Sequence, residues 1–95
     1  MYARLTHFKV DPSRLPELSA KIEEMGPRAK ALPGMIDVYV AWRPDGQGVV
    51  VALYESKGAA DRAVTRIEAL WGDLVNMLSS APRTEVYAHA EHVTR

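Results

Sequence analysis

The 95-residue chain carries 12 basic and 12 acidic side chains and contains no cysteine. This neutral balance gives no general attraction to nucleic acid or to an anionic membrane, and the lack of cysteine excludes disulfide and thiolate chemistry. No apolar run approaches the roughly 20 residues of a membrane span. We therefore expect one cytoplasmic domain over residues 1–95 that binds neither nucleic acid nor a membrane.

The first element predicted along the chain is a strand over residues 2–10. One side of this strand carries Tyr2, Arg4, Thr6, Phe8 and Val10, and the other carries Ala3, Leu5, His7 and Lys9. Neither side is consistently polar, so alternation alone does not tell which side meets the helices. Aspartate, proline and serine at residues 11–13 then predict the start of a helix.

A helix is predicted after residue 13 because apolar residues recur every three or four positions. The stripe consists of Leu15, Leu18, Ile22, Met25, Ala29 and Leu32. Pro27 falls inside the pattern, where it removes a backbone donor and crowds the preceding turn. We expect a kink or a restart of the helix at Gly26-Pro27, and an end at Pro33-Gly34.

Two further strands are predicted over residues 35–43 and 49–54, joined by a turn at residues 44–48. In the earlier of the two, one face is apolar and consists of Ile36, Val38, Val40 and Trp42. The later strand, from Val49 to Tyr54, is apolar throughout, which indicates cover on both faces. Helices of the same chain can cover one face, so we expect a second copy of the chain to cover the other.

A second helix is predicted from Ser56, which is a suitable N-cap, to Leu78. Its buried stripe comprises Val64, Ile67, Trp71, Leu74 and Leu78. Residues 83–93 alternate in polarity and predict a last strand. The resulting β-α-β-β-α-β order is that of a ferredoxin-like split α+β sandwich, which we expect to dimerise sheet to sheet as a homodimer.

Three local signatures accompany this order of elements. They are Leu32-Pro33-Gly34-Met35 before the second strand, Asp45-Gly46 at the hairpin, and Tyr54-Glu55-Ser56-Lys57 with Ala60 after the third strand. With these residues the chain resembles the antibiotic biosynthesis monooxygenase family of dimeric α+β barrels, over almost its whole length. The resemblance implies two sheets packed face to face across a dimer. It also implies oxygenation without a cofactor, which is one activity of that superfamily.

The same superfamily contains haem-degrading enzymes and members with no established role. The haem-degrading branch uses an asparagine on the first strand, with a tryptophan and a histidine on the second helix. This chain has no asparagine in residues 2–10 and no histidine in residues 56–78, and Ala63 stands near the position of the family's tryptophan. We therefore do not expect haem degradation. Tyr54 stands where the polyketide-oxidising branch usually has a tryptophan that contributes to its pocket.

Oxygenation without a cofactor needs a base, a donor to the developing oxyanion and a dry cavity. His7 suits the role of base and Tyr54 could donate to a ring oxygen, so both are candidate catalytic residues. Trp42 and Trp71 are candidate substrate-binding residues that could wall a flat aromatic ligand. Each assignment has a structural alternative, with His7 as a strand histidine between sheets or partly in water, and Tyr54 and Trp71 as core aromatics.

No spacing of cysteine, histidine and carboxylate predicts a zinc site. His89 and His92 are three residues apart, so on one strand they would point to opposite faces. We expect neither a metal nor a cofactor. The predicted function is that of a small cofactor-independent monooxygenase acting on an aromatic or quinol-like molecule. The alternative is a non-catalytic dimer that binds a small apolar ligand or serves as an accessory subunit.

Overall fold

The computed structural model describes residues 1–72 and 74–93. Its elements are the strand β1 (Tyr2–Lys9), the 3-10 turn η1 (Pro12–Arg14), the helix α1 (Leu15–Lys30), the strands β2 (Met35–Trp42) and β3 (Gln47–Tyr54), the helix α2 (Lys57–Gly72), the 3-10 turn η2 (Val75–Met77) and the strand β4 (Arg83–Tyr87). The strands form one antiparallel sheet in the order β2-β3-β1-β4. The fold is thus the predicted ferredoxin-like α+β arrangement.

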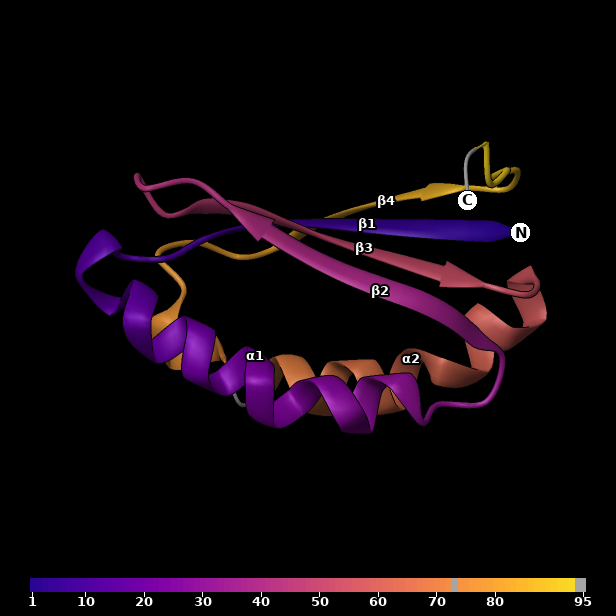
Figure 1. The fold of residues 1–95 in the computed structure, drawn as a ribbon, viewed down its shortest axis with the longest axis horizontal. Helices are drawn as coiled ribbons and strands as arrows, with labels where there is room; N and C mark the ends of the chain where they lie inside the picture. The colour runs from indigo at the N-terminus through magenta and orange to yellow at the C-terminus, as the bar shows by residue number, and fades with distance from the viewer. Residues whose placement is uncertain (73, 94–95) are drawn as a thin grey trace.

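Both helices lie along one face of the sheet, and none of the described helices lies on the other face (Figure 1). β1 is a central strand whose Tyr2 and Phe8 are buried in the core on the helical side. The side of β1 that carries these two aromatic residues therefore faces the helices, which the sequence left open. His7, one position before Phe8, points to the opposite face because side chains alternate along a strand.

The core consists of two clusters on the helical face of the sheet. One surrounds Tyr54 and includes Tyr2, Leu32, Ala52, Ala59, Ala60 and Ala63. The other includes Phe8, Val10, Leu18, Met25, Leu74 and Met77.

Neither of the two helices in the described part of the chain has the length and apolar character that crossing a bilayer needs.

α1 is a single helix from Leu15 to Lys30 with Pro27 inside it, so of the two outcomes that the sequence predicted, a kink or a restart, the restart does not occur. A proline inside a helix removes only one backbone donor. Buried residues on both sides of it, Met25 and Leu32, keep the helix and the turn that follows against the core. Packing of the apolar stripe thus outweighs the local cost of the proline.

The second helix and the last strand are both shorter than predicted. α2 ends at Gly72 rather than at Leu78, and Leu78 instead forms an isolated bridge with Val10. β4 ends at Tyr87 rather than at residue 93, because its partner strand β1 runs out there: Tyr87 pairs with Ala3. Beyond this point the backbone amide of Ala90 donates one hydrogen bond, 3.0 Å long, to the carbonyl oxygen of Met1.

A β-bulge at the start of β2 changes the face to which one residue was assigned. Met35 pairs with Tyr54 and Asp37 pairs with Leu53, so Ile36 is left without a partner in the ladder. The extra residue reverses the alternation before it, as bulges do. Met35 consequently packs against the core, whereas Ile36, predicted on the apolar face with Val38, is 45% exposed.

Candidate functional site

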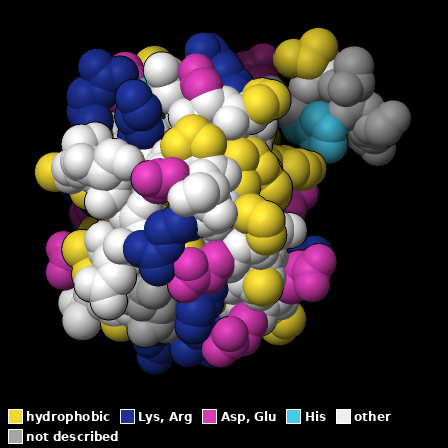
Figure 2. Space-filling view, turned by 90° about the vertical axis from the view of Figure 1, so that its left-hand side faces the viewer, with side chains coloured by type: hydrophobic (Ala, Val, Ile, Leu, Met, Phe, Trp, Pro, Cys, Tyr) yellow, Lys and Arg dark blue, Asp and Glu magenta, His cyan; other side chains and the backbone are white. Residues whose placement is uncertain are grey.

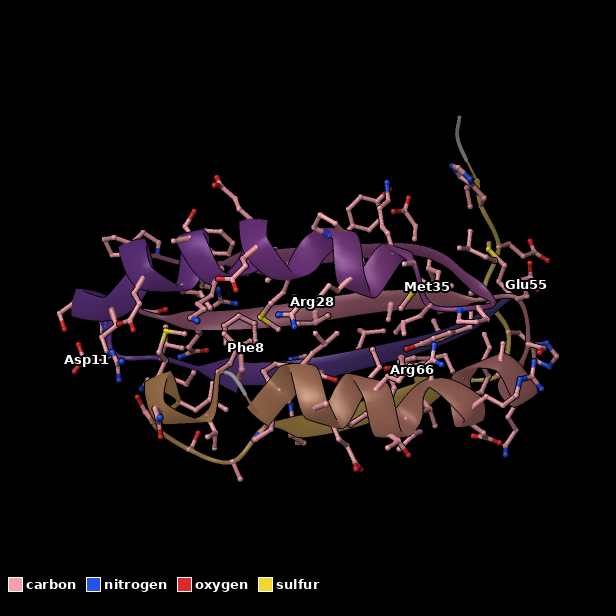
Figure 3. The ribbon with its side chains drawn as sticks, turned by 90° about the horizontal axis from the view of Figure 1, so that it is seen from below. Phe8, Asp11, Arg28, Met35, Glu55 and Arg66 are labelled. Carbon is pink, nitrogen blue, oxygen red and sulfur yellow. The ribbon has the colours of Figure 1, made fainter. Side chains whose placement is uncertain are left out.

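A cavity of about 400 Å³ lies between the sheet and the two helices, lined by residues of β1, β2, β3, α1 and α2. Seen from the helical side, Phe8 lies in the gap between the helices and Met35 lies further along it, and both residues line the cavity (Figure 3). Small-molecule sites commonly have about 300–1,000 Å³. An apolar cavity of about 150 Å³ binds benzene, so this one has room for two or three rings.

The walls of the cavity are mostly apolar and include both tryptophans. Trp71 of α2 meets Phe8 edge to face, with ring centroids 6.0 Å apart and planes inclined by 60°. Gly48 leaves room for the Phe8 ring, since a Cβ atom there would collide with it. Trp42 lines the cavity from the edge strand β2 and is 38% exposed. The structure therefore brings Trp42 and Trp71 to the same cavity, where flat aromatic rings could pack against a ligand.

Hydrophobic side chains also reach the surface at one end of the molecule. In the end view they gather toward the upper right, while lysine, arginine, aspartate and glutamate side chains are spread over the remainder (Figure 2). Apolar surface that gathers in one place, rather than being scattered, is typical of a ligand or partner site.

Tyr54 is the last residue of β3, and its side chain lines the cavity with none of its surface exposed to solvent. Its hydroxyl has no hydrogen-bond partner among the residues that the structure describes. Burial raises the pKa of Tyr54, although the charge of Arg4 acts in the opposite direction. Most buried hydroxyls are hydrogen-bonded, and leaving one unbonded costs free energy. The Tyr54 hydroxyl is therefore a buried donor without a partner among the described residues, on a residue that lines the cavity.

Arg4 of β1 lines the same cavity and is partly buried. It pairs with Ala52, while Tyr2 pairs with Tyr54, so Arg4 and Tyr54 are diagonal neighbours on one face of two adjacent strands. Diagonal neighbours are close enough for long side chains to meet. Within residues 1–72 and 74–93 Arg4 has neither a hydrogen bond nor an ion pair. The sequence contained a signal for this position, because Arg4 shares its side of the strand with two aromatic residues, but our candidates did not include it.

Three other residues with polar side chains line the cavity: Thr6, Ser19 and Glu23. Thr6 shares a hydrogen bond of 3.3 Å with Thr84. Glu23, an exposed residue of α1, is the one carboxylate among the described lining residues, and it forms no ion pair with Arg4. Arg4 and Tyr54 are the two polar lining residues that the register of β1 and β3 makes diagonal neighbours.

His7 lies on the opposite face of the sheet from this cavity. Its Nε2 atom is 2.8 Å from Oε1 of Glu85. It lines a smaller hollow of about 250 Å³ together with Trp42, Arg43 and Val49. The structure thus does not bring His7 together with Tyr54, and a base role for His7 would require a substrate on the open face. Within the described residues, no group of three or more histidine and carboxylate side chains is placed to hold a metal ion.

Because Tyr54 is buried, its ionisation should lower the stability of the protein at alkaline pH. Since its folded-state pKa is raised, the unfolded chain loses the tyrosine proton first. The contribution of Tyr54 to the free energy of unfolding is fully present below the ordinary tyrosine pKa of about 10 and is lost as the pH rises above it. We expect the free energy of unfolding, measured with urea, to fall less steeply above that pH in Tyr54→Phe than in the wild type. Equal dependence of the unfolding free energy on pH in the two proteins would contradict burial of an ionisable Tyr54. The control is Tyr87→Phe, because the Tyr87 side chain is exposed in the wild type.

The fold is one that solved proteins of several bacteria share. A structure from Caulobacter crescentus, provisionally named an antibiotic biosynthesis monooxygenase, superposes with a TM-score of 0.81, at 19% identity over 95% of this chain and 90% of its own. A structure of the same name from Deinococcus radiodurans superposes with a TM-score of 0.81, at 10% identity over 100% of this chain and 98% of its own. A protein from Mycobacterium tuberculosis has a TM-score of 0.76, at 19% identity over 98% of both chains.

These likenesses establish the architecture of the chain: it has the α+β fold of structures that bear the antibiotic biosynthesis monooxygenase name. The resemblance predicted from the sequence is thereby confirmed at the level of the fold. Comparison of the sequence with protein-family models and with curated proteins gives no match. The activity must therefore be argued from the cavity.

Proposed function

We propose that the protein is a small cofactor-independent monooxygenase of the antibiotic biosynthesis monooxygenase type, acting on an aromatic or quinol-like molecule in the cavity between sheet and helices. The observation that carries the proposal is Tyr54: a fully buried hydroxyl without a protein partner among the described residues, in a cavity that is otherwise mostly apolar. A buried donor of this kind is what an oxyanion in a reaction without a cofactor requires.

The reaction best suited to such a site is oxidation of an electron-rich ring that can form an enolate or phenolate. The anion transfers one electron to dioxygen, and the radical pair combines to form a carbon–oxygen bond. Loss of water from the resulting hydroperoxide turns a ring CH2 into a carbonyl group, so one oxygen atom enters the product and the other leaves as water. The Tyr54 hydroxyl donates to the ring oxygen that carries the negative charge, and the apolar walls strengthen this interaction by excluding water.

We propose that the working form is a homodimer in which the two sheets face each other. The support is the face of the sheet opposite the helices, where Leu5, Val51 and Tyr39 lie side by side in the strand register. None of the described helices covers these residues (Figure 1). A stable pairing would bury about 1,600 Å². It would also bury His7 and Glu85, which already form an ion pair when His7 is protonated.

A second candidate function is binding without turnover, as a ligand carrier or an accessory subunit. The observation that favours it is the chemistry of the available polar groups near Tyr54, both of which are hydrogen-bond donors. Donors suffice to bind a molecule, whereas a reaction also requires a route for the substrate proton. Oxygen consumption separates the two functions, because a carrier binds aromatic ligands and consumes none.

The test of the proposal is oxygen uptake with a panel of anthrones and hydroquinones, using heat-denatured protein as the background. We expect uptake with at least one anthrone. Tyr54→Phe should reduce its kcat/KM roughly 2- to 13-fold, the equivalent of one hydrogen bond of about 0.5–1.5 kcal/mol. The matched control is Tyr2→Phe, which alters the tyrosine opposite Tyr54 in the register but not a lining residue. An equal effect of the two substitutions would remove Tyr54 from the site.

A further inference from the structure

We propose that the cavity binds its ligand as an anion: a flat aromatic molecule whose ionised oxygen, a phenolate, enolate or carboxylate, lies between the guanidinium of Arg4 and the hydroxyl of Tyr54. The inference rests on the proposed function for the identity of the site. It adds the charge of the ligand and its orientation, neither of which follows from the fold.

The position of Arg4 is the first argument. Arg4 is set in the central strand β1 with Ala52 of β3 on one side and Val86 of β4 on the other. Its side chain lines the cavity together with that of Tyr54, and its charge acts on the Tyr54 hydroxyl. The two groups thus belong to one end of one cavity, so a single ligand oxygen can accept from both.

The second argument is charge balance. Arg4 is a partly buried cation in a mostly apolar cavity, and it has no ion-pair partner in the described part of the chain. A buried charge is costly unless it is paired. An arginine and a hydroxyl donor side by side match an anionic oxygen, because hydrogen bonds to charged acceptors are stronger than those to neutral ones. A neutral ligand would leave the guanidinium without a counter-charge.

The remainder of the cavity sets the shape of the ligand. Phe8, Trp42 and Trp71 supply aromatic walls, and the volume of about 400 Å³ accommodates a two- or three-ring body. The oxygen therefore points to the end with Arg4 and Tyr54, while the rings fill the part lined by the other aromatic residues. A site that prefers the anion also promotes ionisation: each tenfold preference lowers the apparent pKa of the bound ligand by one unit.

The test compares two probes of the same shape and different charge: naphthoate, which is an anion at neutral pH, and naphthamide with the same ring position, which is neutral. Affinity is measured by calorimetry and by quenching of the fluorescence of the two tryptophans. We expect the wild type to prefer naphthoate by about 10-fold or more. Equal affinity for the two probes, or no binding of naphthoate at millimolar concentration, would overturn the proposal without recourse to any variant.

Substitution of Arg4 then assigns the preference to one residue. Arg4→Met should reduce naphthoate affinity about 10-fold or more and leave naphthamide affinity nearly unchanged. Arg4→Lys, which keeps the charge, should retain part of the preference, and a melting curve verifies that each variant is folded. Arg62→Met removes the same charge from an exposed position of α2 and is the matched control. An unchanged preference in folded Arg4→Met would contradict the assignment.

The outcome is separable from that of the proposed function. Naphthoate binding that depends on Arg4, in a protein that consumes no oxygen with any anthrone, would support an anion site and reject the monooxygenase. Oxygen consumption that persists unchanged in Arg4→Met would support the monooxygenase and reject the anion site.

Discussion

Replacement of Val51 by aspartate is expected to convert the protein from a dimer into a monomer. Val51 lies in the middle of the sheet face opposite the helices, paired with Leu5 on one side and Tyr39 on the other. In a symmetric dimer the substitution buries one carboxylate from each copy, at an effective cost of several kcal/mol per ion. The dissociation constant should therefore rise by about 1,000-fold or more.

Light scattering at micromolar concentration checks this prediction. The wild type should have twice the 10.5 kDa mass of one chain, and Val51→Asp should have the mass of one. Val75→Asp makes the same change in η2, where the side chain is already 57% exposed, and should remain dimeric. Circular dichroism establishes that each variant is folded. A wild-type protein of 10.5 kDa would contradict the proposed dimer.

Trp71→Ala is expected to lower the free energy of unfolding by about 3 kcal/mol, toward the lower end of the range for truncation of a core aromatic residue. Trp71 packs against the cluster around Phe8 and is only partly buried, which is why the lower end applies. The loss should occur whether or not the protein is an enzyme, because the substitution enlarges a cavity in the core.

Urea unfolding of wild type and variant at one protein concentration measures this loss, since the proposed dimer would make apparent stability depend on concentration. Trp42→Ala is the matched control. Trp42 is 38% exposed on an edge strand and should contribute less to stability. A loss for Trp71→Ala no larger than that for Trp42→Ala would show that Trp71 is a wall of the cavity without a structural role.

The order of elements could be predicted from local pattern, whereas their ends depended on tertiary pairing. The stripe that contains Leu18 and Met25 is present in the sequence, and so is the uninterrupted apolar strand from Val49 to Tyr54. The early end of β4 at Tyr87 follows from the point where β1 begins. The bulge that exposes Ile36 depends on register with β3, and no alternation within β2 alone reveals it.

The candidate site was predictable in part for a related reason. Tyr54, Trp42 and Trp71 stood out as aromatic residues on elements with a clear apolar side, and all three line the cavity. The facing of β1 was ambiguous, because both of its sides mix polar and apolar residues. Because of this ambiguity, the sequence could not place two residues. In the structure His7 lies with Glu85 on the sheet face opposite the helices, and Arg4 lines the cavity.

The most direct test of the proposed activity is mass spectrometry of the product formed from an anthrone under isotopically labelled dioxygen in unlabelled water. The proposed reaction predicts one labelled oxygen atom in the new carbonyl group and one in the water released. It also predicts that the labelled product forms more slowly with Tyr54→Phe. A product without label, or a rate no greater than that with heat-denatured protein, would contradict the assignment of the cavity as a monooxygenase site.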